Sequence, residues 1–397
     1  MKWASAASER SSIVTAIEDC AGRIAAGLAG DTPDLIAVFV TPHYADQYDS
    51  LPEILRKHFS KAAFIGCSGI GVIGGAKEIE AGGGVAITAA AMPDVSLKSY
   101  HFEAGDLPSP DAPPSAWEKL LGVSPKDNPH FLILADPYTF PADAFIAGLD
   151  YAYPMSSKVG GLASGAQPYQ AHTVFQGDRC YRSGASVIAM SGDVTVDTVV
   201  AQGCYPVGPV MFITKAKGNI MLELGGKSPL KTVQDLFMSM DEAERQRAAR
   251  QLFIGIVMDP LKEKWGSGDF LIRNVVGADN VTGAIAIGEH LREGQAIQFH
   301  IRDARTAADD LRVQLEHYAR QPGAASSTGA LLFSCTGRGI GLYGVPDHDS
   351  DMFRNLVGSL PLGGFFCNGE IGPVAGTTYL HGYTSSFGLF RPLGLKK

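Results

Sequence analysis

A cysteine and an arginine follow one apolar stretch of the chain closely enough to act together. The stretch at residues 330–334 predicts a buried strand, and Cys335 and Arg338 come after it, with a glycine on either side of the arginine. Ligands of open α/β sheets bind beyond the carboxyl ends of strands. An arginine there could lower the pKa of a thiol or hold a carboxylate with two hydrogen bonds. The structural alternative packs Cys335 as a small apolar side chain and pairs Arg338 with an acid such as Glu370.

A second polar group lies on a glycine-rich turn near the C-terminus. Asn368 and Glu370 follow two phenylalanines. A buried carboxylate needs a partner, so Glu370 could bind the ammonium group of an amino acid while an arginine binds the carboxylate. It could instead pair with Arg302 or Arg338 for the architecture alone. His381 follows a strand-like stretch and is interpreted as a hydrogen-bonded core histidine, with the role of a base as the alternative.

Three glycine-rich turns recur along the chain, at residues 66–69, 160–165 and 363–369, each behind an apolar run. The first carries Cys67 and Ser68, which are further candidates for ligand contact. A phosphate loop would need the Walker lysine or a GxGxxG pattern after the first strand, and both are absent. We therefore expect most of these glycines to permit close backbone packing. The third turn, with its polar residues, is the one expected to face a ligand.

Composition excludes several classes of protein. The chain has 397 residues, 45% hydrophobic and 19% charged, which predicts a globular protein of two domains. A net charge of −8 without clustered lysine and arginine argues against nucleic acid. No apolar run is long enough for a membrane span, and the N-terminal residues show no signal-peptide pattern. The expected location is the cytoplasm of a bacterium.

The cysteines also bear on cofactors. All six are scattered, without a CxxC pair, so neither structural zinc nor a disulfide framework is expected. Residues 347–351 offer metal-ligand types, but adjacent ligands on a short loop rarely build a closed site. Asp349 is expected to cap the following helix instead. We expect no metal and no cofactor.

Strand-like and helical patterns alternate in the first half of the chain. Continuous apolar runs at Leu35–Val40 and His130–Ala135 predict strands covered on both faces. A helix and a returning strand follow each run, and a proline-rich loop at residues 106–114 separates the two units. A third such unit begins at residue 330. Between residues 253 and 301, short connections predict a mostly antiparallel sheet.

The expected fold is therefore α/β, with two domains of mixed sheets flanked by helices and built from a repeated strand–helix–strand–hairpin unit. The expected boundaries are an N-terminal helix at residues 1–29, one domain at 30–226 and a second at 227–392.

Several stretches together resemble one known family, the FIST-domain proteins, over residues 30 to 390. One stretch, Gln202 to Pro209, resembles the end of the FIST N-terminal domain. The others resemble the FIST C-terminal domain: Gly268 to Asn274, Phe299 to Asp303, Phe333 to Gly339, Gly364 to Pro373 and His381 to Thr384.

The resemblance implies a sensory domain pair that binds a small ligand, with amino acids among the candidates. This chain has no kinase, receiver, methyl-accepting or F-box segment, so a sensor of this kind would signal through a separate protein partner, with a homo-oligomer as a further option. The expected ligand contacts are Arg338, Cys335, Asn368, Glu370, His381, Cys67 and Ser68. Two alternatives stay open: an acyl-transfer enzyme with Cys335 or Cys67 as nucleophile and His381 as base, and a protein-interaction scaffold.

Overall fold

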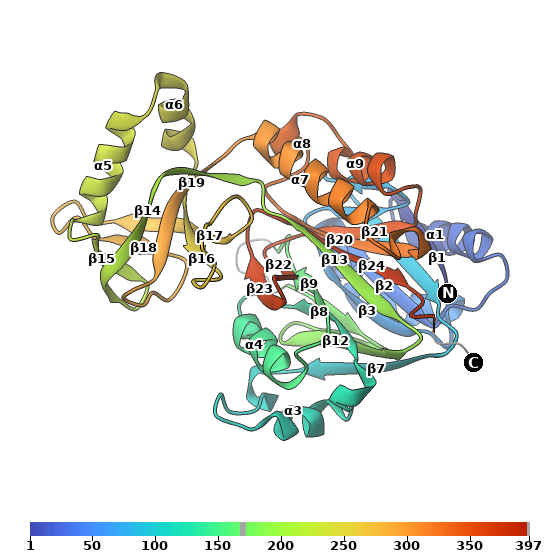
Figure 1. Ribbon diagram of the computed structural model, residues 1–397. Helices are drawn as coiled ribbons and strands as arrows, with labels where there is room; N and C mark the ends of the chain where they lie inside the picture. The colour runs from blue at the N-terminus through green and yellow to red at the C-terminus, as the bar shows by residue number, and fades with distance from the viewer. Residues whose placement is uncertain (167–171, 395–397) are drawn as a thin grey trace. The chain divides into compact units, whose positions relative to one another are not determined.

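The computed structural model describes residues 1–166 and 172–394 (Figure 1). The chain forms two compact units: unit 1 comprises Met1–Val200 and the segment from Arg312 onward, and unit 2 is Ala201–Leu311. The predicted class, α/β with mixed sheets flanked by helices, is confirmed. No helix in the described ranges is long and apolar enough to cross a membrane.

Unit 1 contains the same succession of elements three times. The first repeat is β1 (Lys2–Ser8), α1 (Ile13–Leu28), β2 (Leu35–Val40), η1 (Pro42–Ser50), α2 (Leu51–His58), β3 (Ala63–Ser68), β4 (Val72–Gly74), β5 (Lys77–Ile79) and β6 (Val85–Ala91). The second is β7 (Val95–Phe102), η2 (Ala104–Asp106), α3 (Pro114–Leu121), η3 (Pro125–Asp127), β8 (His130–Ala135), α4 (Ala142–Ala152), β9 (Lys158–Leu162), β10 (Val174–Gln176), β11 (Arg179–Tyr181) and β12 (Ala185–Gly192).

The third repeat is interrupted in sequence by unit 2. It consists of β13 (Thr195–Ala201), α7 (Ala304–Ala319), η4 (Ala324–Ser326), β20 (Gly329–Cys335), α8 (Ile340–Tyr343), α9 (His348–Leu356), β21 (Leu362–Cys367), β22 (Glu370–Val374), β23 (Thr377–His381) and β24 (Ser385–Arg391). The boundary between the two compact units falls within α7.

Each repeat exchanges strands with the other two. The three sheets of unit 1 have the orders β1-β6-β2-β3-β10-β11, β7-β12-β8-β9-β22-β23 and β13-β24-β20-β21-β4-β5. The hairpin of the second repeat thus completes the first sheet, that of the third completes the second, and that of the first completes the third. The pairs β2–β3, β8–β9 and β20–β21 are parallel and lie inside their sheets. This cyclic exchange fastens the three repeats into one unit.

Apolar side chains fill both faces of these sheets. Phe39, Leu134 and Phe333, one from each sheet, belong to a single central core. The outer faces are covered by helices, as Figure 1 shows for α1, for α3 and α4, and for α7 and α9. The Phe353 ring on α9 stacks on Phe387 of β24, with 5.4 Å between the ring centroids. Coverage on both sides explains why the strands are continuous apolar runs.

A carboxylate holds each exchanged hairpin to a helix of the repeat that receives it. The pairs are Glu78 with the Ser350 hydroxyl (2.7 Å), Asp150 with the Thr378 hydroxyl (2.8 Å) and Asp49 with Arg182 (2.9 Å).

Unit 2 is a closed barrel with two helices. Its elements are β14 (Cys204–Lys217), β15 (Ile220–Leu224), α5 (Pro229–Ser239), α6 (Glu242–Arg250), β16 (Leu252–Val257), β17 (Phe270–Ala278), β18 (Ile285–Ile287) and β19 (Ala296–Arg302). The barrel order is β14-β15-β18-β17-β16-β19, and the paired strands are antiparallel. The antiparallel sheet predicted for this section is therefore confirmed. A buried cluster that includes Ile213, Met221 and Phe299 forms its core.

Candidate functional site

The glycine turns begin at equivalent positions of the three parallel strand pairs. Gly66, Gly160 and Gly364 each lie opposite a residue of the neighbouring parallel strand. A Cβ atom would lie 2.1 Å from that residue's carbonyl oxygen at Gly66, and 1.8 Å from it at Gly160 and Gly364. Side chains cannot be accommodated at such distances. The prediction that close backbone packing accounts for these glycines is confirmed.

The three turns then meet. The backbone N–H of Ser164 donates to the Ser68 carbonyl, and that of Asn368 donates to the Leu162 carbonyl, both at 3.0 Å. The Phe366 N–H donates to the Gly71 carbonyl at 3.0 Å. The strand ends of all three repeats therefore converge on one place in unit 1.

Where the first and third turns meet, the Ser164 hydroxyl lies between the Ile70 N–H and the Phe366 carbonyl, in place of a direct hydrogen bond between these two backbone groups. The Ile70 N–H donates to Ser164 Oγ at 2.8 Å, and the same hydroxyl donates to the Phe366 carbonyl. Ser164 is fully buried, so its hydroxyl links the first and third turns from the second. We call Ile70, Ser164 and Asn368 the turn junction, because each occupies the same position in its own repeat.

A buried histidine contacts Asn368 of the turn junction, and a buried aspartate contacts that histidine in turn. Asp136 directly follows β8, and its Oδ1 lies 3.3 Å from His172 Nδ1. His172 Nε2 lies 3.4 Å from Asn368 Nδ2, which also donates to the Ala163 carbonyl at 2.9 Å. A carboxylate beside Nδ1 favours the tautomer with its proton there, so that Nε2 accepts from the amide.

The charge of Asp136 is stabilised by its neighbours. Burial alone would raise its pKa, but hydrogen bonding to His172 and to the hydroxyl and N–H of Thr139 outweighs burial and lowers it. The Thr139 hydroxyl donates to Asp136 Oδ2 at 2.5 Å. The Asp136 carboxylate is therefore a fixed negative charge next to Nδ1 of His172.

Two polar side chains reach the surface here. Asn368 is exposed, and its Oδ1 carries no hydrogen bond from the described part of the chain. Tyr138 is 83% exposed, and its ring centroid lies 5.4 Å from that of His172. The arrangement offers an acceptor and an aromatic ring to solvent, both next to a buried Asp–His pair.

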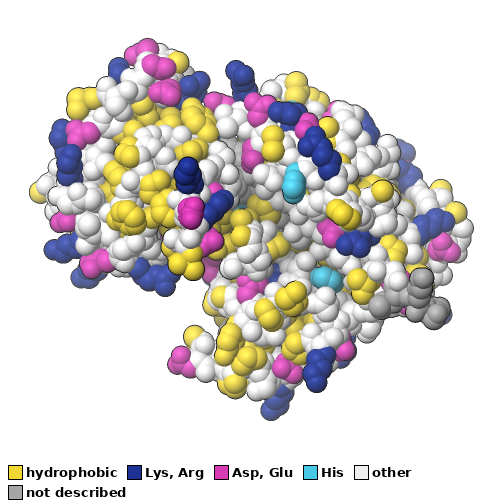
Figure 2. All heavy atoms as spheres, in the orientation of Figure 1, with side chains coloured by type: hydrophobic (Ala, Val, Ile, Leu, Met, Phe, Trp, Pro, Cys, Tyr) yellow, Lys and Arg dark blue, Asp and Glu magenta, His cyan; other side chains and the backbone are white. Residues whose placement is uncertain are grey.

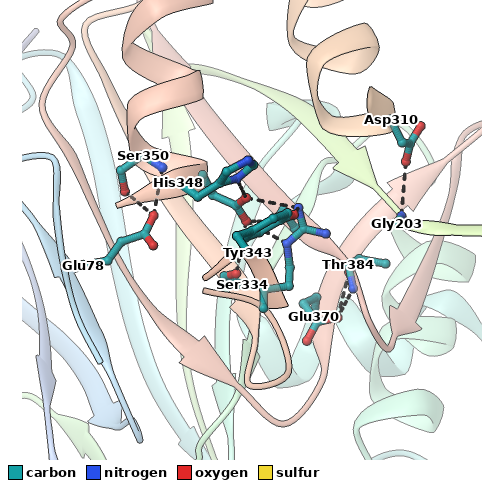
Figure 3. Close-up of polar contacts among 12 residues, drawn as sticks. Glu78, Gly203, Asp310, Ser334, Tyr343, His348, Ser350, Glu370 and Thr384 are labelled. Carbon is teal, nitrogen blue, oxygen red and sulfur yellow. Dashed lines mark hydrogen bonds and ion pairs between the residues drawn. The ribbon is translucent and has the colours of Figure 1, made fainter. Parts of the chain in front are cut away.

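Arg338 lies in a separate, buried cluster. Its Nε and Nη2 donate to Asp349 at 2.7 and 3.1 Å, and Nη2 also donates to the Tyr343 hydroxyl at 2.6 Å. Figure 3 shows Tyr343, His348 and Ser334 close to one another, and His348 Nδ1 lies 3.1 Å from Asp349 Oδ1. The ion pair lowers the pKa of Asp349 against the effect of burial. The expectation that Asp349 caps the helix is wrong. Asp347 holds the N-cap position of α9, and Asp349 binds Arg338 instead.

The cysteine candidates lie inside the protein. Cys335, the last residue of β20, is 8% exposed and by sheet register matches Asp136, which directly follows β8. Cys67 is fully buried, and burial raises its thiol pKa well above the ordinary value. A nucleophilic cysteine needs the opposite environment, so the surroundings of Cys67 favour a packed, unreactive thiol over a nucleophile. The neighbouring Ser68 hydroxyl accepts from the Thr173 N–H at 3.2 Å.

Glu370 and His381 lie opposite each other on the β22–β23 hairpin. Glu370 is fully buried, and its Oε2 accepts from the Thr384 hydroxyl at 2.7 Å, as Figure 3 shows. His381 Nε2 lies 2.9 Å from the Gly372 carbonyl. By sheet register, Val72 and Val174 hold the position of Glu370 in the other repeats. The third repeat alone therefore has a buried carboxylate there.

Of the predicted contacts, the structure brings Asn368 and the Ser68 backbone to the junction. It places Cys335 at the end of β20 and Arg338 in the loop that follows. Sequence reasoning missed Asp136, His172 and Ser164. One signal was available for Asp136, because it directly follows an apolar run, as Cys335 follows the apolar run at residues 330–334. No comparable pattern marks His172.

The fold class of this protein is defined by three α/β repeats that exchange strands. The barrel interrupts the third repeat in sequence. Family models match this chain as FIST N domain over residues 34–227 and FIST C domain over residues 229–373. The chain belongs to the FIST family, whose domains are sensory and signal-transduction domains.

The relatives include uncharacterized proteins. One from Mycobacterium tuberculosis is 37% identical over 371 residues, covering 91% of this chain and 92% of that protein. One from Mycobacterium bovis is 35% identical over 373 residues, 94% of each. An F-box/LRR-repeat protein of Arabidopsis thaliana is 30% identical over 115 residues, 28% of this chain and 22% of that one. Among solved structures, a cyanuric acid hydrolase aligns over 99% of this chain and all of its own, with 9% identity and a TM-score of 0.36, too low to inform fold or activity.

Proposed function

We propose that this protein is an intracellular sensor that binds a small polar metabolite at the turn junction and signals through a separate protein partner. The observation that carries the proposal is the exposed amide of Asn368, whose orientation is fixed by His172 and, through it, by Asp136. Sites on rigid, hydrogen-bonded supports lose little entropy when a ligand binds.

The hydrogen bonds of Asn368 suggest the chemistry of the ligand. Its Nδ2 is occupied by the Ala163 carbonyl and His172, so Oδ1 is the atom available to a ligand, as an acceptor. The partner is then a donor such as an ammonium group, which the buried Asp136 charge also favours. An amino acid is accordingly our first candidate.

The test is a thermal-shift screen of the full-length protein against the twenty amino acids and a panel of small polar amines and acids. Binding to the folded state raises the melting temperature by mass action. We expect at least one compound with an ammonium group to give a saturable increase. If no compound does, while a partner protein from the same cells co-purifies stoichiometrically, the scaffold alternative replaces the sensor.

A further inference from the structure

A cavity of about 490 Å³ lies in the second repeat of unit 1, away from the turn junction, between the loop after β7 and the outer face of α4. Leu107 and Pro110 of the loop, Trp117 of α3, and Ala147 and Tyr151 of α4 are among its lining residues. Small-molecule pockets usually measure roughly 300–1,000 Å³ and have mostly apolar walls. This cavity has the size and lining of such a pocket.

The pocket exists because α4 carries small residues on this face. Ala144, Ala147 and Gly148 lie at helical spacing along it. A Cβ atom at Gly148 would lie 1.9 Å from Cζ2 of Trp117, so the indole ring already occupies that space. Trp117 is 5% exposed and packs against Phe145, with 5.8 Å between ring centroids. The aromatic wall is therefore held in place by the core beneath it.

The charge around the pocket is mainly negative. Residues 98–158, which include all of its lining residues, carry eight aspartates and glutamates against four lysines and no arginine. Glu103, Asp106, Asp111 and Glu118 lie in the loop and in α3, and Lys119 is the lysine of α3. Figure 2 shows hydrophobic side chains gathered on the face that bears α3 and α4. An apolar, aromatic pocket in an acidic setting favours cations over anions.

We propose that this α3–α4 pocket is a second binding site, specific for a small planar aromatic cation. The ring system lies between Tyr151 and the loop prolines, over Trp117, and the positive charge faces the acidic segment 103–118. Tyr151 is 62% exposed and lies at the rim, so it can close over the ligand. The site is independent of the proposed metabolite site, because none of its lining residues belongs to the turn junction.

The experiment compares two fluorescent probes of similar size on the full-length protein: thioflavin T, an aromatic cation, and 1-anilinonaphthalene-8-sulfonate, an aromatic anion. We expect thioflavin T to bind saturably and at least fivefold more tightly than the anion. Ala147→Phe fills the pocket and weakens thioflavin T binding at least tenfold. Ala26→Phe, at an exposed position of α1, is the matched control and changes it less than twofold. Circular dichroism verifies folding, and Ala144→Phe replaces Ala147→Phe if that variant does not fold.

The charge is tested by the double substitution Asp111→Asn with Glu118→Gln. It should weaken thioflavin T binding at least threefold and leave binding of the anion unchanged. The proposal is overturned if Ala147→Phe and Ala26→Phe bind thioflavin T equally well. Preference for the anion, or a double variant with unchanged affinity for the cation, would overturn the cation specificity.

Discussion

Glu78 should make the stability of this protein fall as pH rises above neutrality. It lies on the exchanged hairpin strand β5, is 5% exposed, and accepts hydrogen bonds from the N–H and hydroxyl of Ser350 at 2.8 and 2.7 Å. Burial and, to a lesser extent, the charge of Asp349 raise its pKa to about 8, from an ordinary value of 4.5. Glu78 is thus protonated in the folded protein at neutral pH.

The sign and size of the effect follow from linkage. Because the pKa is raised in the folded state, the stability associated with the protonated carboxyl is complete below pH 4.5 and is lost as pH rises through 8. Each pH unit in that window changes the free energy of unfolding by roughly 1.4 kcal/mol at most, for a ceiling of about 5 kcal/mol across it.

Glu78→Gln keeps an acceptor for Ser350 and removes the titration. We expect the variant to match the wild type at pH 5 and to exceed it by about 2–4 kcal/mol in free energy of unfolding at pH 9. Urea denaturation at pH 5, 7 and 9, followed by tryptophan fluorescence, measures this. Glu53→Gln, at an exposed position of α2, is the control and should leave the pH dependence unchanged. Parallel pH profiles for wild type and Glu78→Gln would show that Glu78 does not titrate with folding in this range.

Three further outcomes are expected. Gly160→Ala should lower the free energy of unfolding by more than about 3 kcal/mol, because its Cβ would lie 1.8 Å from a backbone carbonyl oxygen, whereas Gly22→Ala, in open space on α1, should be neutral or stabilising in the same urea titration. Arg338→Ala should cost about 3–5 kcal/mol by leaving Asp349 buried without its counter-charge, and a loss below about 1 kcal/mol in chemical denaturation would contradict this. Cys67 should react with iodoacetamide at least a hundredfold more slowly than a free thiol, as followed by peptide mass spectrometry; labelling at the rate of a free thiol would favour the acyl-transfer alternative.

Elements inside the repeats were predictable because their patterns are local. Leu35–Val40 and His130–Ala135 are strands with the predicted bounds, since burial on both faces leaves a continuous apolar run. Strand β1, where alanine and serine predominate, escaped prediction because such short side chains give no clear periodicity. Asp349, expected as a helix cap, pairs instead with an arginine eleven residues earlier.

The exchange of hairpins could not be read from the sequence. Gly74 on β4 pairs with Gly363 on β21, far along the chain, and no local pattern encodes that choice of partner. The candidate site has the same limit. Asn368 was predicted from its turn, but its contact with His172 spans 196 residues. A glycine-rich turn predicts that backbones approach closely, and only the fold tells which ones.

We expect Asn368 to bind the metabolite directly. The most direct test is isothermal titration calorimetry of the strongest compound from the thermal-shift screen with wild type, Asn368→Ala and the control Asn355→Ala, an exposed asparagine of α9. Loss of a hydrogen bond to a charged ligand group costs about 1.5–3 kcal/mol. The dissociation constant should therefore rise at least tenfold in Asn368→Ala and change less than twofold in Asn355→Ala. Equal affinity in all three proteins would show that Asn368 does not bind the metabolite and that the site lies elsewhere.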